Sequence, residues 1–246
     1  MSSTKRDLPE NGVPDMSDSK TRILDAALMH VPFDGWSDTA LRAAAADCGI
    51  DHATARALFP RGGVDMALAF HQRGDAQMAA RLAATDLSAL RFRDRVGFAV
   101  RARIEAAEDR ELVRRGSTLF ALPPYAADGA RAIWGTADLI WTTLGDSAED
   151  YNWYTKRLTL SGVYSSTVLF WLGDDSAGAQ ETWNFLDRRI DGVMRFEEVK
   201  RAVERNPLGR ALSAGPRALL SCLRAPRRDA AQDLPGAIRP APAQQG

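Results

Sequence analysis

In the stretch "ILDAALMHVPFDGWSDTALRAAAADCGIDHATARALFPRGGVDMALAF", residues 23–70, clear turn signals separate short helices, and this pattern is the main indication of the fold. Ser37 and Asp51 are residue types that cap helix N-termini, and Gly49 is a common helix terminator. Pro60 stops the helix before it, since proline lacks a backbone N–H. The pattern predicts helices from about Asp18 or Ser19 to before Pro32, from Ser37 to Gly49, from Asp51 to Pro60 and from about Val64 onward.

The remainder of the chain also reads as helical, because Ala, Leu, Arg, Glu and Gln dominate it and runs of alternating β-branched residues are missing. Pro123 and Pro124 force one break. Further helices are expected over residues 88–108, 109–121, 127–144, 148–172 and 176–204. The chain is therefore predicted to be all-α, with about nine or ten helices in a bundle that follows a helix-turn-helix part.

Composition allows a sizeable core, since 45% of the 246 residues are hydrophobic. The numbers of basic and acidic residues are equal, so net charge favours no particular partner. Polar and Pro-rich composition predicts disordered tails at both ends. The expected segments are a tail over 1–18, the helix-turn-helix part over 19–62, the main bundle over 63–204, a basic segment over 206–228 and a second tail over 229–246.

Cysteine usage and the N-terminus bear on location. Cys48 and Cys222 lie far apart without metal-type spacing, which fits a reducing compartment. The first twenty residues contain acidic side chains and no apolar run, so neither a secretory signal nor a transit peptide is expected. No run of about 18 uncharged apolar residues occurs, so no membrane-spanning segment is expected. Together with the Ala- and Arg-rich composition, these features predict a bacterial cytoplasm.

Residues 23–70 resemble the helix-turn-helix of TetR-type regulators in the order of their helices, Gly-aromatic turn, Gly-Ile turn and Phe-Pro break. In that family the short third helix reads DNA. In this chain Arg56 stands where a phosphate-binding tyrosine is usual, and alanines fill much of that helix. Residues 20–62 contain five basic and five acidic side chains, whereas a DNA reader needs a positive face. We interpret this part as an inherited fold without a DNA partner.

The run "EDYNWYTKRLTLSGVY", residues 149–164, sets four aromatic side chains beside two cations. At about 100° per residue this helix carries two apolar stripes, and the simplest interpretation buries both in a central helix. Near its start, however, charged and aromatic side chains alternate. Exposed Trp, Tyr and Arg together are typical of interface hot spots. We therefore interpret Asp150, Trp153, Tyr154 and Arg157 as a partner-docking patch, with simple core packing as the alternative.

Three segments, "DYNWYTKR", "VYSSTVLFWL" and "TWNFLDRRID", resemble the ubiquinone-biosynthesis accessory lipid-binding proteins called the coenzyme Q biosynthesis protein nine family. The resemblance covers about residues 20–200, and that family is similar to TetR proteins in fold. It implies a non-enzymatic protein that binds isoprenoid quinone lipids in an all-helical pocket. It also implies a partner, the di-iron hydroxylase that acts on demethoxyubiquinone. The chemistry would belong to that partner.

The resemblance also implies where the hydroxylase docks. The family's docking residues match Trp153 and Tyr154, with Arg157 in support. The other docking residues that it implies are Asp138, Ile140 and Asp150. TetR-like proteins often dimerise through their last helices, so a homodimer is expected as well.

A polyprenyl quinone needs an apolar sleeve, because each CH₂ that leaves the bilayer costs about 0.8 kcal/mol. A helical bundle offers such a sleeve between its helices. The regions 119–144 and 158–172 are rich in Leu, Ile, Trp and Phe and are expected to supply it. Candidate lining residues are Trp141, Leu160, Tyr164 and Leu169.

The segment "NPLGRALSAGPRALLSCLRAPRR", residues 206–228, has five arginines and no acidic residue. On a helical wheel the leucines gather on one side and the arginines on the other, as in helices that lie in a membrane interface. An ordinary core-covering helix is the alternative, and Gly215 with Pro216 must kink either one. The expected membrane-contacting residues are Leu208, Arg210, Leu212, Arg217, Leu219, Leu223 and Arg224.

An enzyme is not expected from the residue inventory. His30, His52 and His71 share no ligand spacing, and Glu-x-x-His pairs for a di-iron site are missing. No cofactor or metal is therefore expected. The sequence favours a lipid-binding accessory protein of ubiquinone biosynthesis, peripheral on the inner face of the bacterial plasma membrane. The alternative is a TetR-type, ligand-responsive transcriptional repressor.

Overall fold

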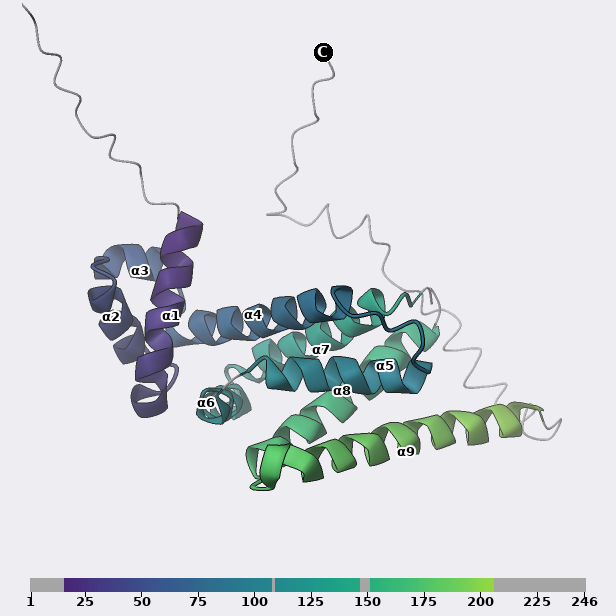
Figure 1. The fold of residues 1–246 in the computed structure, drawn as a ribbon. Coiled ribbons are helices and arrows are strands. Elements are labelled where there is room, and N and C mark those ends of the chain that lie inside the picture. The colour runs from purple at the N-terminus through teal and green to yellow at the C-terminus, as the bar shows by residue number, and fades with distance from the viewer. Residues whose placement is uncertain (1–15, 108, 147–150, 206–246) are drawn as a thin grey trace, which may run out of the picture. The chain divides into compact units, whose positions relative to one another are not determined.

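The structure is a computed structural model that describes residues 16–107, 109–146 and 151–205 (Figure 1). Within these ranges the chain forms nine α-helices, one short 3-10 helix and no strand. This confirms the predicted all-α fold with about nine or ten helices. The elements are α1 Met16–Asp34, α2 Asp38–Asp47, α3 His52–Leu58, α4 Gly63–Ala83, α5 Phe92–Glu105, α6 Arg110–Ala121, α7 Ala126–Thr143, α8 Tyr151–Leu172, η1 Ala177–Ala179 and α9 Gln180–Arg205.

Several predictions lie outside the described residues. They are the N-terminal tail as far as residue 15, Asp150 with the predicted start of its helix, the whole basic segment 206–228 with its membrane-contacting residues, and the tail 229–246. The predicted tail over 1–18 was too long, because α1 begins at Met16.

The described residues group into two compact units. One combines the residues up to Arg81 with Ala102–Ala132, and the other combines Leu82–Arg101 with the residues from Ile133 onward. The boundaries fall within α4, α5 and α7, so the units do not follow the linear order of the chain.

The first helix does not end before Pro32, as the sequence suggested, but continues to Asp34. Proline in the last turn removes only one backbone donor from the helix, which is a small loss there. The end is fixed by Gly35, whose φ of +67° suits glycine and whose N–H donates to the Val31 carbonyl oxygen at 2.8 Å. The helix therefore stops where a left-handed residue is available.

The next two helices begin at their predicted caps. The Ser37 hydroxyl oxygen accepts from the Ala40 N–H at 3.2 Å and starts α2. Asp51 Oδ1 accepts from the Thr54 N–H at 2.9 Å and starts α3. Helices α1, α2 and α3 pack together, as the helix-turn-helix pattern requires (Figure 1).

Trp36 connects these helices to the rest of the first unit. Its ring is buried, its Nε1–H donates to the Leu112 carbonyl oxygen at 3.0 Å, and its centroid lies 5.3 Å from that of Phe70. A Cβ on Gly63 would stand 2.1 Å from the Trp36 carbonyl oxygen, so only glycine fits there. The Gly-aromatic turn thus sets the packing of α4 and α6 as well as the turn itself.

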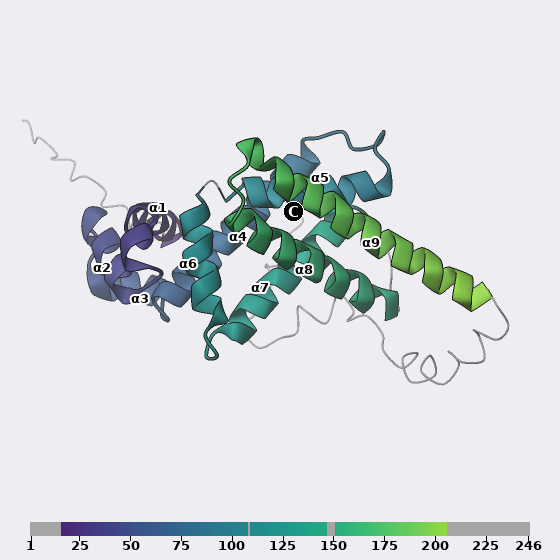
Figure 2. The same cartoon turned by 90° about the horizontal axis from the view of Figure 1, so that it is seen from below.

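In the second unit, α8 and α9 lie side by side (Figure 2). The guanidinium carbon of Arg101 on α5 lies 4.6 Å from the ring centroid of Trp183, which brings α5 against α9. Each fully buried large apolar side chain stabilises the fold by about 1.5–3 kcal/mol, so these residues decide which faces turn inward. The large buried side chains of α8 and α9 are Leu160, Tyr164, Trp171, Trp183, Leu186 and Ile190.

Asp174 shapes the turn between α8 and α9 through hydrogen bonds of its carboxylate. Its carboxylate accepts from the N–H of Ser176 at 2.8 Å and from the N–H and hydroxyl of Thr182 at 2.9 and 2.6 Å. These hydrogen bonds hold the pKa of Asp174 well below its ordinary value. Among the described helices, none is both long enough and apolar enough to cross a bilayer.

His71 on α4 lies in a buried polar network of the first unit. Arg103 donates from Nε to Asp75 Oδ1 at 2.6 Å and from Nη2 to the His71 carbonyl oxygen at 2.9 Å. His71 Nε2 lies 3.2 Å from the Ala132 carbonyl oxygen, which can only accept, so Nε2 carries the proton. Burial, aided by the Arg103 charge, lowers the pKa of His71 from 6.5 to about 4. The ring is therefore neutral near neutral pH.

Replacing His71 by glutamine is expected to make the fold less sensitive to acid. The pKa of His71 is lowered in the folded chain, so the unfolded chain binds the extra proton first and stability falls as the pH drops from about 6.5 toward about 4. This shift corresponds to a total loss of roughly 3 kcal/mol. Glutamine keeps an N–H donor for Ala132 but does not titrate. Urea unfolding monitored by circular dichroism near pH 7 and near pH 5 measures the difference, and equal acid sensitivity of both proteins would contradict it.

Candidate functional site

Five residues from α7 and α8 gather in the second unit: Trp134, Asp138, Trp153, Tyr154 and Arg157. We call them the tryptophan–arginine cluster. Four of the five were predicted as docking residues from the sequence, and the structure brings those four together. Trp134 was missed, although its one-turn spacing from Asp138 would have placed both on the same face of a helix.

Arg157 is the centre of the cluster and is only 1% exposed. Its Nε donates to Asp138 Oδ1 at 2.5 Å, and its Nη1 donates to Asp146 Oδ2 at 3.1 Å. Nη1 also donates to the Trp153 carbonyl oxygen at 3.2 Å, and the guanidinium carbon lies 3.9 Å from the Trp153 ring centroid. A buried guanidinium needs such partners, because an uncompensated buried charge costs several kcal/mol.

This burial corrects two predictions. Arg157 was expected to be exposed in a docking patch, but its ion pairs draw it into the interior. Ile140 was also expected to dock a partner, yet its side chain is fully buried in α7. Neither side chain offers surface to a partner, so both can act only by positioning the residues around them.

A second cation, Lys156, completes the electrostatics of the cluster. Lys156 Nζ lies 2.6 Å from Asp146 Oδ1, so the nearly buried Asp146 carboxylate bridges Lys156 and Arg157. The Trp141 indole N–H donates to the Lys156 carbonyl oxygen at 3.1 Å, and Lys156 Nζ lies 5.2 Å from the Trp141 ring centroid. Two cations and two carboxylates balance in charge. Sequence reasoning missed Asp146 because it follows Gly145, outside any helix.

The aromatic rings of the cluster form a triangle. Their centroids lie 4.8 Å apart for Trp153 and Tyr154, 5.9 Å for Trp134 and Trp153, and 6.4 Å for Trp134 and Tyr154. All three side chains are half-buried, and the Asp138 side chain is 43% exposed. The arrangement thus presents rigid aromatic surface beside a carboxylate, which suits binding of another molecule. Among the described residues, no group of three or more His, Cys, Asp or Glu could hold a metal ion.

The four residues proposed to line a lipid pocket lie in three settings. Leu160 and Tyr164 are buried on the inner side of α8, and Trp141 is half-buried in a stack with Phe92. Leu169 is 65% exposed, because its position on the helix places it on the outer side of α8. It therefore does not share a sleeve with Leu160 and Tyr164.

In the helix-turn-helix part, the short helix α3 has little basic surface. Arg56 Nη1 donates to Asp38 Oδ1 at 2.8 Å, so its charge is compensated within the fold. His52, Ala53, Thr54 and Ala57 are exposed on the same helix. Two of these four residues offer only a methyl group to a phosphate, and the Thr54 hydroxyl donates to Asp51 Oδ2 at 2.5 Å. The absence of a DNA partner stays a prediction, which this pairing supports.

Replacing Arg157 by methionine is expected to destabilise the fold by about 3 kcal/mol or more, because Asp146 would remain buried with half of its compensation removed. Urea unfolding monitored by circular dichroism measures the loss. Asp138→Asn is the matched comparison and should cost only about 1 kcal/mol, since that carboxylate is partly hydrated. A loss no larger in Arg157→Met than in Asp138→Asn would show that the buried pair contributes little.

Comparison with known proteins identifies the region that contains this cluster. Residues 126–197 match the family model COQ9. The chain is 31% identical over 183 residues to "Ubiquinone biosynthesis protein COQ9, mitochondrial" of Drosophila melanogaster, an alignment that covers 72% of this chain and 56% of that protein. The protein of the same name in Rattus norvegicus is 30% identical over 205 residues, with 79% and 64% covered. The chain thus spans between about half and two thirds of the length of these relatives.

Among solved structures, a TetR transcriptional regulator from Nitrosomonas europaea ATCC 19718 is similar in fold, with a TM-score of 0.59 and 19% identity. The match covers 70% of this chain and 96% of that one. At this identity the likeness shows the fold alone, and it confirms the predicted TetR-like architecture. Residues 126–197, from α7 into α9, carry the COQ9 family domain.

Proposed function

We propose that this protein is a non-enzymatic accessory protein of ubiquinone biosynthesis, which binds isoprenoid quinone intermediates and presents them to the di-iron demethoxyubiquinone hydroxylase. The observation that carries the proposal is the COQ9 match over residues 126–197. That region contains the whole tryptophan–arginine cluster. The relatives are named for ubiquinone biosynthesis, and the same role is proposed for this chain.

The cluster is the proposed docking surface for the hydroxylase. Trp153 and Tyr154 are half-buried, so part of each ring stays available to a partner. The buried ion pairs of Arg157 hold these rings in one geometry before binding. A preorganised aromatic surface binds well because few side chains must be ordered on association. Asp138 adds a partly exposed carboxylate at the edge.

The lipid would occupy space opened between helices of the second unit. Leu160 and Tyr164 face that interior and are the proposed lining. Trp141 lies beside the first turns of α8 and is the third proposed lining residue. An isoprenoid tail is apolar throughout, so buried apolar side chains match it. Because these side chains are packed in the structure, helices would have to separate to admit the tail.

Location and assembly are part of the same proposal. We propose a bacterial protein, peripheral on the inner face of the plasma membrane, with residues 206–228 in contact with the lipid surface. The names of the relatives place those proteins in mitochondria. We also propose a homodimer. DNA is not a proposed partner, since Arg56 is already paired with Asp38.

Organic extracts of the gently purified full chain are expected to contain isoprenoid quinones or their precursors, detected by mass spectrometry. The physical reason is that such tails dissociate slowly from an apolar sleeve into water. A chain that carries only bulk phospholipid, or none, would contradict quinone binding. A gel shift with genomic DNA fragments would then test the regulator alternative.

The double variant Trp153→Ala with Tyr154→Ala is expected to bind the hydroxylase roughly thirtyfold more weakly, as for the loss of interface hot spots. Isothermal titration with the purified hydroxylase measures the affinity, and circular dichroism checks the helical content. The matched control is Phe170→Ala with Phe185→Ala, which removes another half-exposed stacked pair from the same unit. Equal affinities of the two double variants would count against docking at the cluster.

A further inference from the structure

A cavity of about 460 Å³ lies between α8 and α9, within the second unit and away from the buried side chains of the cluster. This volume falls in the range of small-molecule sites. Among the described residues, its lining includes hydroxyl groups and guanidinium groups but no carboxylate. The lining residues are Thr155, Thr159, Gly162, Val163 and Ser166 from α8, and Arg188, Arg189, Gly192 and Val193 from α9.

Small residues make this cavity. At about 100° per residue, Thr155, Thr159, Gly162 and Ser166 fall on one narrow stripe of α8. A Cβ added to Gly162 or to Gly192 would meet no atom within 4 Å, so packing does not require glycine at either position. The two helices therefore leave open space between them.

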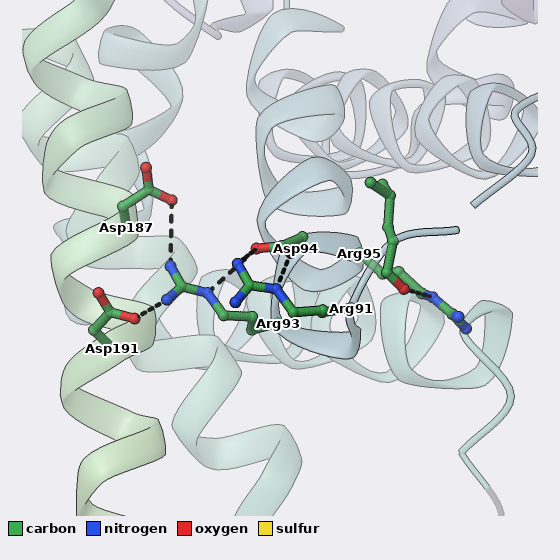
Figure 3. A network of polar contacts seen from close by, with 7 residues as sticks. Arg91, Arg93, Asp94, Arg95, Asp187 and Asp191 are labelled. Carbon is green, nitrogen blue, oxygen red and sulfur yellow. Dashed lines mark hydrogen bonds and ion pairs between the residues drawn. The ribbon is translucent and has the colours of Figure 1, made fainter. Parts of the chain in front are cut away.

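Two acidic residues of α9, Asp187 and Asp191, are directed to a cation of another helix. Figure 3 shows Asp187 and Asp191 pointing to Arg93 of α5. Arg93 pairs with Asp191 and lies 4.0 Å from Asp187. Arg188 and Arg189 line the cavity, whereas Asp187 and Asp191 interact with Arg93. The α8 side adds no negative charge, because residues 151–172 contain no Asp or Glu.

Both arginines are exposed, and both guanidinium groups lie near one aromatic ring. Their guanidinium carbons lie 6.0 Å (Arg188) and 4.9 Å (Arg189) from the centroid of Phe185, which stacks on Phe170 at 4.5 Å. In the part of the chain that the structure describes, neither arginine forms an ion pair. Their N–H donors are therefore available for an anion, and guanidinium groups bind phosphate oxygens in a bidentate manner.

We propose that this cavity binds a phosphate ester, with Arg188 and Arg189 on the phosphate and the Thr159 hydroxyl as a further polar contact. The ester is either a glycerophospholipid head group or a soluble compound of the same chemistry. Leu158 and Leu169, 67% and 65% exposed on the outer side of α8, would take an acyl chain. The site goes beyond the proposed function, because an isoprenoid quinone carries no charge and would not need the arginines.

Isothermal titration of the full chain with two probes tests the proposal. Glycerol 3-phosphate presents the phosphate ester alone, and dihexanoyl phosphatidic acid adds two short acyl chains while staying soluble. Both probes avoid a membrane surface, to which other basic segments would also bind. Comparable affinities would identify a soluble phosphate ester as the ligand, whereas much tighter binding of the lipid would identify the lipid head group.

Two variants address the cavity in different ways. Arg188→Gln with Arg189→Gln removes the charges, and Gly162→Leu fills the space without changing charge. Each is expected to lower the affinity for the tighter-binding probe roughly tenfold or more. The charge-matched control, Arg42→Gln with Arg131→Gln, changes exposed arginines of the first unit and should bind like the wild type.

Binding by either cavity variant that equals the control would overturn the proposal, as would failure of the wild type to bind both probes. Light scattering of the same samples tests whether a second copy of the chain occupies the cavity instead. If either cavity variant lowers the molar mass in solution, the cavity is a contact between two copies of the chain, and the ligand assignment is wrong. The quinone content of the purified protein is a separate measurement, so the two proposals can fail independently.

Discussion

A buried guanidinium between two carboxylates determines how α7 and α8 meet. Arg157 reaches Asp138 on α7 and Asp146 in the connection that follows, and it does so from inside the fold. Because an uncompensated buried cation costs several kcal/mol, the three elements are constrained to one relative placement. The same pairing positions the aromatic rings of the cluster, since the Arg157 guanidinium also contacts the Trp153 ring.

This coupling gives the proposed docking surface a defined geometry although its rings are only half-buried. The rings of Trp153 and Tyr154 contact each other, and Trp134 contacts both as a third ring. The buried ion pairs of Arg157 position the backbone of α8, and the three aromatic rings pack against one another. A surface of this kind suits recognition, because its shape is established before a partner arrives. The match of residues 126–197 to COQ9 covers this whole arrangement.

The N-terminal part illustrates how a fold can persist while its surface changes. Ser37, Asp51 and Trp36 maintain the helix-turn-helix geometry through local caps and one buried indole. None of these contacts depends on what α3 shows to solvent. With Arg56 paired to Asp38, the helix that reads DNA in TetR proteins presents mostly small side chains here. The fold of this region therefore does not by itself imply DNA binding.

Local sequence was enough to predict the helices, their order and the resemblance to COQ9. Caps such as Ser37 and Asp51 bond to backbone groups three residues away, so their effect is visible in local sequence. Which of the two apolar stripes of α8 is buried depends instead on contacts between elements that lie apart in the chain. Leu160, Tyr164 and Trp171 turn inward and leave Leu158 and Leu169 outside, because the inward face also meets the carboxylates that neutralise Arg157. Those carboxylates, Asp138 and Asp146, come from other elements, and no local pattern can pair them with a cation on α8.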